Sequence, residues 1–190
     1  MEGGEPTDEA IAARVQKGDA EEFGTLMERY QNKLMRYGRR FLADREDVTD
    51  IVHDVFMQSY KNIQSFDPAQ RFSPWIYRIA HNAFVNEIRR KSHSPFVLPD
   101  FDTFVGYVPY DDPAEGERER SDMKRIIERG LDKLRSGERE ILVLFYLEEL
   151  SYKEIAEVLQ IPLGTVGVRV SRAKAALKKA YGELNLTYDF

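Results

Sequence analysis

The residues with the clearest chemical pattern lie between Val158 and Gly182, a stretch that contains neither Asp nor Glu. Side chains that donate hydrogen bonds or carry positive charge recur within it: Thr165, Arg169, Ser171, Arg172, Lys174 and Lys178. A helix face with cations and no acids can approach phosphates without internal neutralisation, and its shorter polar side chains can reach base edges. The pattern therefore predicts a nucleic-acid-binding helix.

Two short helices joined by a turn must position these side chains. Ser151 and Glu154 have the S-x-x-E spacing of a capping box, which predicts a helix that begins there. Pro162 ends this helix, and Gly164 and Thr165 suit the start of a second one. The apolar face of the second helix is formed by residues at intervals of three and four: Val166, Val170, Ala173 and Leu177. We interpret the segment as a helix-turn-helix; the alternative is a surface helix hairpin whose basic side chains are simply solvated.

A second candidate surface lies in residues 73–91. Ser73 suits an N-cap, and Pro74 suits the first helical position, where its missing amide hydrogen costs nothing. Apolar residues fall on one side of this helix, and the other side is predicted to carry Tyr77, Arg78, His81, Asn82, Asn86, Arg89 and Arg90. Amides can pair with adenine and cations with phosphate, so this face predicts a second nucleic-acid surface, although polar outer faces are also common without such a role.

The loop before that helix, residues 65–72, contains three side chains of interest. Phe66, Phe72 and Arg71 could together stack on and hold an unpaired base, because aromatic faces bind any exposed base. The alternative is that both rings fill the local core. The sequence leaves these two interpretations open.

Helical periodicity extends over most of the remaining chain. Asp19 and Glu22 suggest a capping box for a helix that continues to Phe41. Further helices are predicted at residues 44–63, 123–134 and 138–147. In the first of these, three acids share the outer face, where they either bind a basic partner or are solvated: Asp47, Asp50 and Asp54. The fold class is therefore all-α.

Charge is segregated along the chain, whose overall net charge is -5. Residues 1–30 and 92–122 carry net charges of -5 and -6, whereas residues 31–91 and 123–190 carry +4 and +2. Residues 92–122 also contain prolines and glycines that interrupt every helix pattern. We expect two small helical domains, residues 1–91 and 123–190, joined by an acidic linker at residues 92–122, with the helix-turn-helix in the C-terminal domain.

Composition excludes several classes of site. The absence of cysteine excludes a disulfide framework and a thiolate metal site. The three histidines, His53, His81 and His93, are not at ligand spacing, and no cofactor or metal is expected. The N-terminus has no signal segment and no apolar run approaches a membrane span, so a soluble cytoplasmic protein without membrane insertion is expected.

These motifs, taken in order, resemble the extracytoplasmic-function group of bacterial sigma factors. The resemblance rests on DREDVTDIVHDVF, FSPWIYRIAHNAFVNEIRR, an acidic linker and LSYKEIAEVLQIPLGTVGVRVSRAKAAL, and it covers about residues 20–180. It implies a protein that binds core RNA polymerase and promoter DNA, recognises minus-10 and minus-35 elements and assists DNA melting. It also implies an anti-sigma factor as a partner and a monomer when free.

The resemblance assigns roles to the candidate residues. The acidic helix would dock on polymerase through Asp47, Asp50, His53, Asp54 and Met57. The loop at residues 66–72 would capture a minus-10 base, with Asn82 at a base-contacting position, and the final helix would read minus-35 DNA. In that helix Gly167 stands where many members have a basic residue, and Val168 cannot donate a hydrogen bond, so we expect an altered or weaker minus-35 preference. The linker would enter a nucleic-acid channel of the polymerase through Asp100, Asp102, Asp111 and Asp112.

Two other classes of protein compete with this interpretation. A conventional helix-turn-helix regulator would sense a ligand, dimerise and bind duplex DNA without polymerase, but the apolar stripes are all needed for two small cores. An enzyme would need a phosphate-binding loop, an activated nucleophile or a ligand cluster, and the sequence contains none of these patterns.

Overall fold

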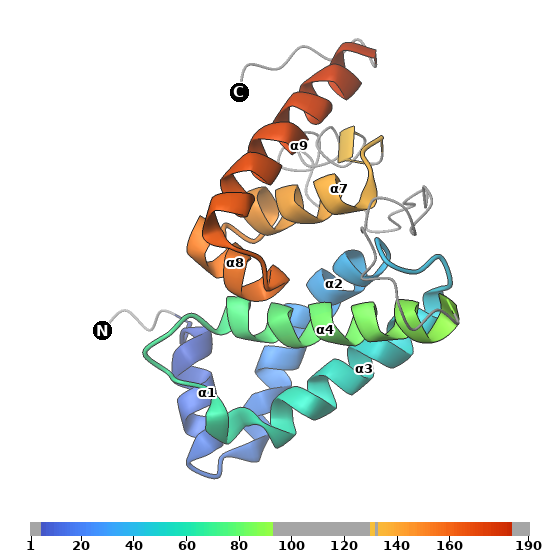
Figure 1. Ribbon diagram of the computed structural model, residues 1–190. Coiled ribbons are helices and arrows are strands. Elements are labelled where there is room, and N and C mark those ends of the chain that lie inside the picture. The colour runs from blue at the N-terminus through green and yellow to red at the C-terminus, as the bar shows by residue number, and fades with distance from the viewer. Residues whose placement is uncertain (1–4, 93–129, 132, 184–190) are drawn as a thin grey trace. The chain divides into compact units, whose positions relative to one another are not determined.

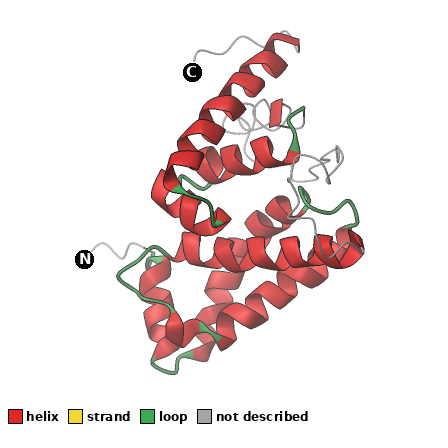
Figure 2. Cartoon of the chain, in the orientation of Figure 1, coloured by secondary structure: helices red, strands yellow, loops and turns green. Residues whose placement is uncertain are grey.

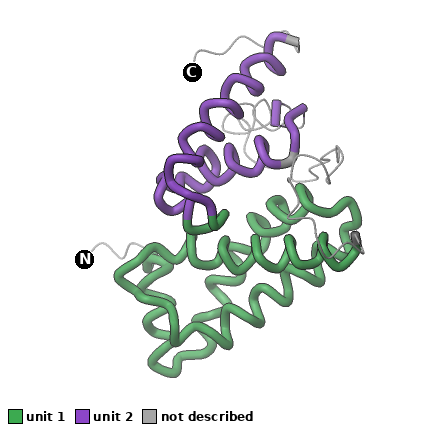
Figure 3. The backbone as a smooth tube through the Cα atoms, in the orientation of Figure 1, with its two compact units in different colours: residues 1–94, 157–160 green, residues 95–156, 161–190 purple. Residues whose placement is uncertain are grey.

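The structure, a computed structural model, describes residues 5–92, 130–131 and 133–183. Every regular element in these residues is helical, which confirms the all-α fold class (Figures 1 and 2). The backbone forms two compact units, residues 1–94 with 157–160 and residues 95–156 with 161–190 (Figure 3). Residues 157–160 lie at the end of a helix whose other residues belong to the C-terminal unit. We therefore call residues 5–92 the first unit, and residues 130–131 and 133–183 the second unit.

The elements of the first unit follow one another as α1 (Asp8–Gln16), the 3₁₀ turn η1 (Ala20–Glu22), α2 (Phe23–Gly38), α3 (Arg45–Lys61), the 3₁₀ turn η2 (Ile63–Ser65) and α4 (Phe72–Ser92). Side-chain caps start two of these helices. Thr7 Oγ1 accepts a hydrogen bond from the Ala10 amide at 3.2 Å, and Asp44 Oδ1 accepts one from the Glu46 amide at 2.8 Å. Both bonds satisfy amides that lack a partner within the helix.

Aromatic rings fill much of the core of the first unit. The Tyr37 ring contacts Phe41, Tyr77 and Phe84 edge-on, with centroids 5.0, 5.2 and 6.2 Å apart. Such edge contacts add to the stabilisation that burial of the rings provides. Aliphatic side chains from all four α-helices complete this core: Ile11, Val15, Leu26, Leu34, Val48, Val52, Val55, Ile76 and Ile88.

Three features of the first unit differ from the sequence-based expectations. The sequence analysis missed α1. The predicted Asp19–Glu22 capping box is wrong, because Glu22 Oε2 instead accepts a hydrogen bond from Arg14 Nη2 of α1 at 3.1 Å. Helix α4 begins at Phe72 rather than after a Ser73 cap, and Pro74 still lies in the first turn, where no amide hydrogen is needed.

The second unit contains α7 (Ser136–Leu142), the π-helical turn η3 (Val143–Leu147), α8 (Tyr152–Leu159) and α9 (Leu163–Glu183). The buried Arg139 donates to the carbonyl oxygens of Leu131 at 2.8 Å and Leu134 at 3.3 Å, which ties α7 to the preceding residues. The helix predicted at residues 138–147 is thus an α-helix that widens into a π-turn. Of the helix predicted at residues 123–134, only residues 130–131 are described as helical.

The predicted linker at residues 92–122 lies outside the described residues, except for Ser92 at the end of α4. The predicted roles of Asp100, Asp102, Asp111 and Asp112 therefore fall outside them too. Among the helices that the structure describes, none is both long and apolar enough to cross a membrane.

Candidate nucleic-acid interface

The turn between α8 and α9 fixes the helix-turn-helix. At the start of α8, the Ser151 amide donates to Glu154 Oε2 at 2.6 Å and the Glu154 amide donates to Ser151 Oγ at 3.3 Å, so the capping box is confirmed. At its end, Gln160 adopts a φ of 54° and the Ile161 amide donates to the Ala156 carbonyl at 3.2 Å. The positive φ at Gln160 turns the chain sharply into α9.

One face of α9 is buried and the opposite face is exposed. The predicted apolar stripe is confirmed, since its members are at most 1% exposed: Val166, Val170, Ala173 and Leu177. We call six of the exposed side chains of the helix the α9 outer face: Val168, Arg169, Ser171, Arg172, Lys178 and Lys179. Thr165 lies half-buried at its edge. Among the described residues, this face combines cations, a hydroxyl and no acid, and it has the chemistry of a helix that binds in a DNA groove.

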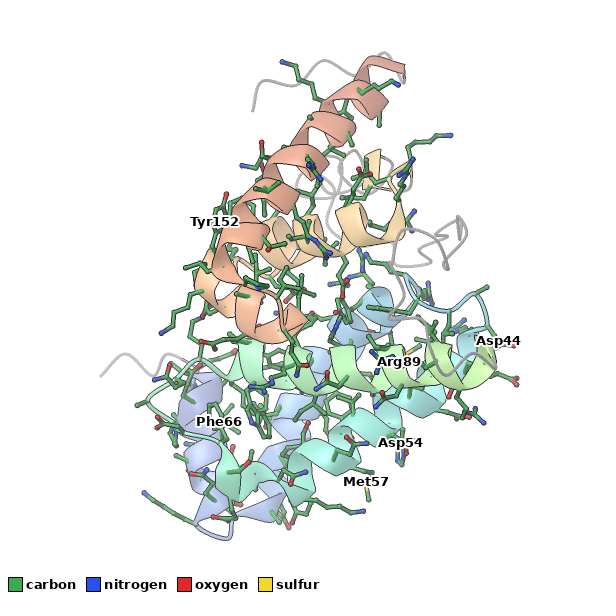
Figure 4. All side chains as sticks on the ribbon, in the orientation of Figure 1. Asp44, Asp54, Met57, Phe66, Arg89 and Tyr152 are labelled. Carbon is green, nitrogen blue, oxygen red and sulfur yellow. The ribbon has the colours of Figure 1, made fainter. Side chains whose placement is uncertain are left out.

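A polar stripe runs along α4 in the first unit. It is formed by Arg78, Asn82, Asn86 and Arg89, which follow one another at intervals of four, four and three residues and so share one helix face. Asn82 is half-buried and the other three are exposed. Figure 4 shows Arg89 on the outside of α4. We call these four residues the α4 polar stripe.

Near the C-terminal end of α4, two basic side chains form ion pairs. Arg90 donates two hydrogen bonds, each 2.7 Å long, to the carboxylate of Glu87. These bonds lower the pKa of Glu87. Lys91 pairs with Asp47 of α3, and this hydrogen bond raises the pKa of Lys91. The first pair thus links two residues within α4, and the second links α4 to α3.

The chain matches known protein families and relatives along most of its length. Models of sigma-70 region 2 and sigma-70 region 4 match residues 26–94 and 124–177. The chain is 33% identical to the ECF RNA polymerase sigma factor SigW of Bacillus subtilis over 177 residues, which cover 90% of this chain and 95% of SigW. It is 35% identical to the ECF RNA polymerase sigma-E factor of Haemophilus influenzae over 178 residues, 90% of this chain and 94% of that protein. The chain belongs to the ECF sigma factors.

A solved structure agrees with this assignment. The sigma factor is similar to CnrH, whose structure was determined in complex with the cytosolic domain of CnrY, with a TM-score of 0.63 and 27% identity over 94% of this chain and 99% of CnrH. The resemblance read from the sequence is therefore confirmed, and the function of the chain is promoter-directed transcription initiation. Members of this family are initiation factors.

The structure corrects the predicted face of α4 at two positions. Tyr77 is completely buried, and its ring packs against Tyr37 instead of facing outward. His81 is 8% exposed, and its Nδ1 lies 3.3 Å from the Tyr37 hydroxyl. Both residues were expected on the outer face of the sigma factor. They lie inside because α4 packs against both α2 and α3, so that its buried face is wider than a single apolar stripe.

The burial of Phe66 and Phe72 decides between the two interpretations that the sequence left open. Phe66 is 4% exposed and Phe72 is fully buried, and their ring centroids lie 5.3 Å from each other. Each also packs against Trp75, with centroids 5.3 and 5.4 Å apart. Figure 4 shows Phe66 turned into the first unit. The alternative, in which both rings fill the local core, is correct, while Arg71 beside them is exposed.

Most of the predicted polymerase-docking residues share an exposed face of α3. Asp50, His53, Asp54 and Met57 follow one another at helical spacing, and all are exposed. Met57 is 45% exposed, and it projects from α3 together with Asp54 (Figure 4). We call these four residues the α3 acidic face. Asp47 differs from them because its carboxylate is paired with Lys91.

Lys174 does not belong to the α9 outer face. Its Nζ lies 4.7 Å from the ring centroid of Phe145 and 5.2 Å from that of Tyr146. Phe145 in turn packs against Tyr152 of α8, with centroids 5.5 Å apart. Lys174 is half-buried and its charge lies over the rings of Phe145 and Tyr146, so it faces η3 rather than outward.

Sequence reasoning missed the residues of α1 that contact the loop before α4. Gln16 Nε2 donates to the carbonyl oxygens of Ile63 and Phe66, each at 2.7 Å. Glu9 Oε1 accepts a hydrogen bond from the Phe72 amide at 2.9 Å. The available signal was the start of α1 itself, where Thr7 precedes two acids in a first helical turn.

Proposed function

We propose that this ECF sigma factor binds core RNA polymerase, reads minus-35 DNA with the α9 outer face and reads and opens minus-10 DNA with the α4 polar stripe and the loop before it. The observation that carries the proposal is the α9 outer face: an exposed, acid-free helix face presented by a capped helix-turn-helix. The Arg and Lys side chains of the α9 outer face supply affinity for phosphates, and its side chains that reach base edges supply selectivity.

In the minus-35 module, the proposed base contacts come from Arg169, Arg172, Ser171 and Thr165, and the proposed phosphate contact comes from Lys178. Their support is exposure: all are exposed on α9 except Thr165, which is half-buried. Val168 is 51% exposed in the middle of the same face, where it offers only apolar contact. An altered or weaker minus-35 preference follows from this chemistry. A selection of promoter variants that returned the common minus-35 sequence of the family would contradict it.

In the minus-10 module, the α4 polar stripe combines amides at Asn82 and Asn86 with cations at Arg78 and Arg89. Arg71 lies one residue before the same helix. Amide groups read bases through paired hydrogen bonds, and cations hold the sugar–phosphate backbone. Unpairing and unstacking a base of the duplex costs a few kcal/mol. A protein that binds the extracted base offsets this cost, so no nucleotide needs to be hydrolysed. Arg90 has a smaller role in this scheme because Glu87 holds its guanidinium.

The α3 acidic face is the proposed contact with core polymerase. Two exposed carboxylates and an exposed Met suit a partner surface that is basic with an apolar centre. Asp47 contributes less in this proposal, because Lys91 already neutralises its charge.

An anti-sigma factor is the other proposed partner, and the cytoplasm is the proposed location. Support comes from CnrH, which was solved in complex with the cytosolic domain of CnrY. A protein that covered the α9 outer face or the α3 acidic face would prevent binding to promoter or polymerase, so one inhibitor would suffice to silence the sigma factor.

The decisive experiment is run-off transcription from genomic fragments by bacterial core polymerase with and without the purified chain. New start sites that require the chain support the proposal, and the double variant Asp50→Lys, Asp54→Lys should then lose binding to core. The matched control Glu21→Lys, Glu28→Lys makes the same charge change on exposed residues of η1 and α2 and should retain it. Specific duplex binding without new transcripts would instead favour a conventional regulator.

A further inference from the structure

The loop that joins α3 to α4 is fastened to α1 at both of its ends. At the first end, the side-chain amide of Gln16 donates to the Ile63 and Phe66 carbonyls, each at 2.7 Å, and Gln64 Nε2 donates back to the Gln16 carbonyl at 2.9 Å. At the second end, Glu9 Oε1 accepts the Phe72 amide at 2.9 Å. The partners lie 47 to 63 residues apart in the chain, so these bonds exist only in the folded first unit.

Between the two ends, the backbone forms a short exposed turn. Phe66 and Phe72 are buried, whereas every residue of 67–71 is exposed. Within the turn, Asp67 Oδ1 accepts the Ala69 amide at 3.0 Å and the Asp67 carbonyl accepts the Gln70 amide at 2.9 Å. The buried rings fix where the turn starts and stops, and the hydrogen bonds from α1 fix the direction in which it leaves each ring. The polar groups of this turn, rather than the rings, face solvent just before the start of α4.

We propose that Glu9 and Gln16 are positioning residues for minus-10 recognition: they hold the 67–71 turn in the conformation that receives an unpaired base of the promoter strand. This inference rests on the proposed function of the first unit. A turn that is already ordered before DNA arrives loses less conformational entropy on binding, so its contacts with the base contribute more fully to affinity. Gln16 acts at the buried start of the turn and Glu9 at its end, and neither needs to touch DNA.

A disruptive variant at each residue tests the assignment. Gln16→Glu replaces the donor with an acceptor that faces two carbonyl oxygens, so both hydrogen bonds are lost and repulsion is added. Glu9→Ala removes the oxygen that accepts the Phe72 amide, whereas Glu9→Gln retains one and serves as the conservative rescue. All three variants are made in the full chain and bound to core polymerase. The DNA is taken from a promoter fragment on which the wild-type holoenzyme starts transcription.

The measurement is the affinity of each holoenzyme for the single non-template strand across the minus-10 element, with an abasic site introduced at each position in turn. For the wild type, we expect one position, the captured base, to cost about ten-fold in affinity. For Gln16→Glu and for Glu9→Ala, we expect the intact strand to bind about five- to ten-fold more weakly than it binds the wild type. Removing the base at that position should then cost each of these variants less than about a further two-fold. Glu9→Gln, which keeps the hydrogen bond to the Phe72 amide, should bind like the wild type, and affinity for core and for minus-35 duplex should be unchanged in all three variants.

This non-additivity separates positioning from a general loss of structure, since groups that act as one unit do not add. A variant that lost the same factor with every strand, or lost affinity for core as well, would overturn the positioning role. So would a Gln16→Glu or Glu9→Ala holoenzyme that bound like the wild type. If the wild type starts transcription but shows no position that is sensitive to base removal, this inference fails while promoter-directed initiation stands. A wild type that starts no transcription with core would overturn the proposed function and this inference with it.

Discussion

At the residue scale, Gly38 shows how closely the helices of the first unit approach one another. A Cβ atom at this position would lie 2.7 Å from Phe84 Cε1 and 2.8 Å from Val48 Cγ1, closer than side-chain carbons pack. We expect Gly38→Ala to destabilise the first unit by about 1 to 3 kcal/mol, because either the ring or α3 must shift. Urea denaturation followed by circular dichroism gives the free energy of unfolding.

Gly24 supplies the matched control in the same helix, α2, because a Cβ there would meet nothing within 4 Å. Gly24→Ala should leave stability unchanged or raise it by up to about 1 kcal/mol. Equal destabilisation by both substitutions would mean that the cost at Gly38 does not come from contact with Phe84 and Val48.

A second residue-scale prediction concerns Glu87. Its hydrogen bonds from Arg90 hold its pKa below the usual range in the folded chain. The ionised carboxylate is therefore more stable in the folded than in the unfolded chain. It stabilises the fold at pH values above the ordinary Glu pKa of about 4.3, and this stabilisation is lost as the pH falls through the lower pKa of the folded state.

Denaturation of the wild type and Glu87→Gln at a series of pH values from 7 to 3 tests this sign. The wild type should be the more stable protein at pH 7, and the difference in free energy of unfolding should shrink through the acidic range and vanish once the carboxyl is protonated in both states. A difference that stays constant, or grows towards acid, would contradict the assigned ion pair.

The errors of sequence reasoning at this scale share one physical cause. Tyr77 and His81 were assigned to the outer face because each has a polar group, yet both rings are mostly apolar and fit the interior once the hydroxyl of Tyr37 meets His81. Phe66 and Phe72 could be read as a stacking site or as core, and only the packing with Trp75 decides between them. Types and spacing place a residue on a helix, but the width of the buried face depends on how many helices pack against it.

At the element scale, α8 and α9 were predictable and α1 was not recognised. A capping box, a Pro-containing turn and an apolar stripe all lie within 30 residues of sequence, and local physics suffices to define the helix-turn-helix. The role of α1 depends on Gln16 and Glu9 reaching a loop about 50 residues later, and no local pattern contains that information.

Gly167 allows the packing of these two elements to be tested. A Cβ at this position in α9 would lie 3.8 Å from Tyr152 Cε2 of α8, which is an ordinary contact. Glycine costs about 1 kcal/mol relative to alanine within a helix. We therefore expect Gly167→Ala to raise the free energy of unfolding of the second unit by about 0.5 to 1 kcal/mol, measured by chemical denaturation.

Gly164→Ala provides the comparison for this substitution. A Cβ at Gly164 would meet nothing within 4 Å, and the residue lies in the first turn of α9, so its gain should be smaller. A loss of stability in Gly167→Ala would show that α8 and α9 approach each other more closely than 3.8 Å allows.

At the scale of the whole molecule, the charge distribution governs how the free sigma factor meets DNA. The chain as a whole carries a net charge of -5, although the segments with the α4 polar stripe and the α9 outer face are net positive. The acids between them, which include Asp100, Asp102, Asp111 and Asp112, repel phosphates and oppose non-specific binding in the absence of polymerase. This arrangement favours a protein that reaches its promoter only as part of the holoenzyme.

Neutralising that segment tests the argument. With these four aspartates changed to asparagine, the net charge rises by four, and we expect the free chain to bind non-promoter duplex DNA several-fold more tightly at low salt, with the gain disappearing as salt screens the charges. The control neutralises four acids that are exposed in the first unit, Asp19, Glu21, Glu28 and Glu46, by the corresponding amides. If overall net charge alone decided binding, both sets would have the same effect. A larger effect of the segment between the two basic blocks, measured by fluorescence anisotropy over a range of salt concentrations, would show that the position of the acids along the chain matters, because a repulsive charge acts most strongly within a Debye length of the bound phosphates.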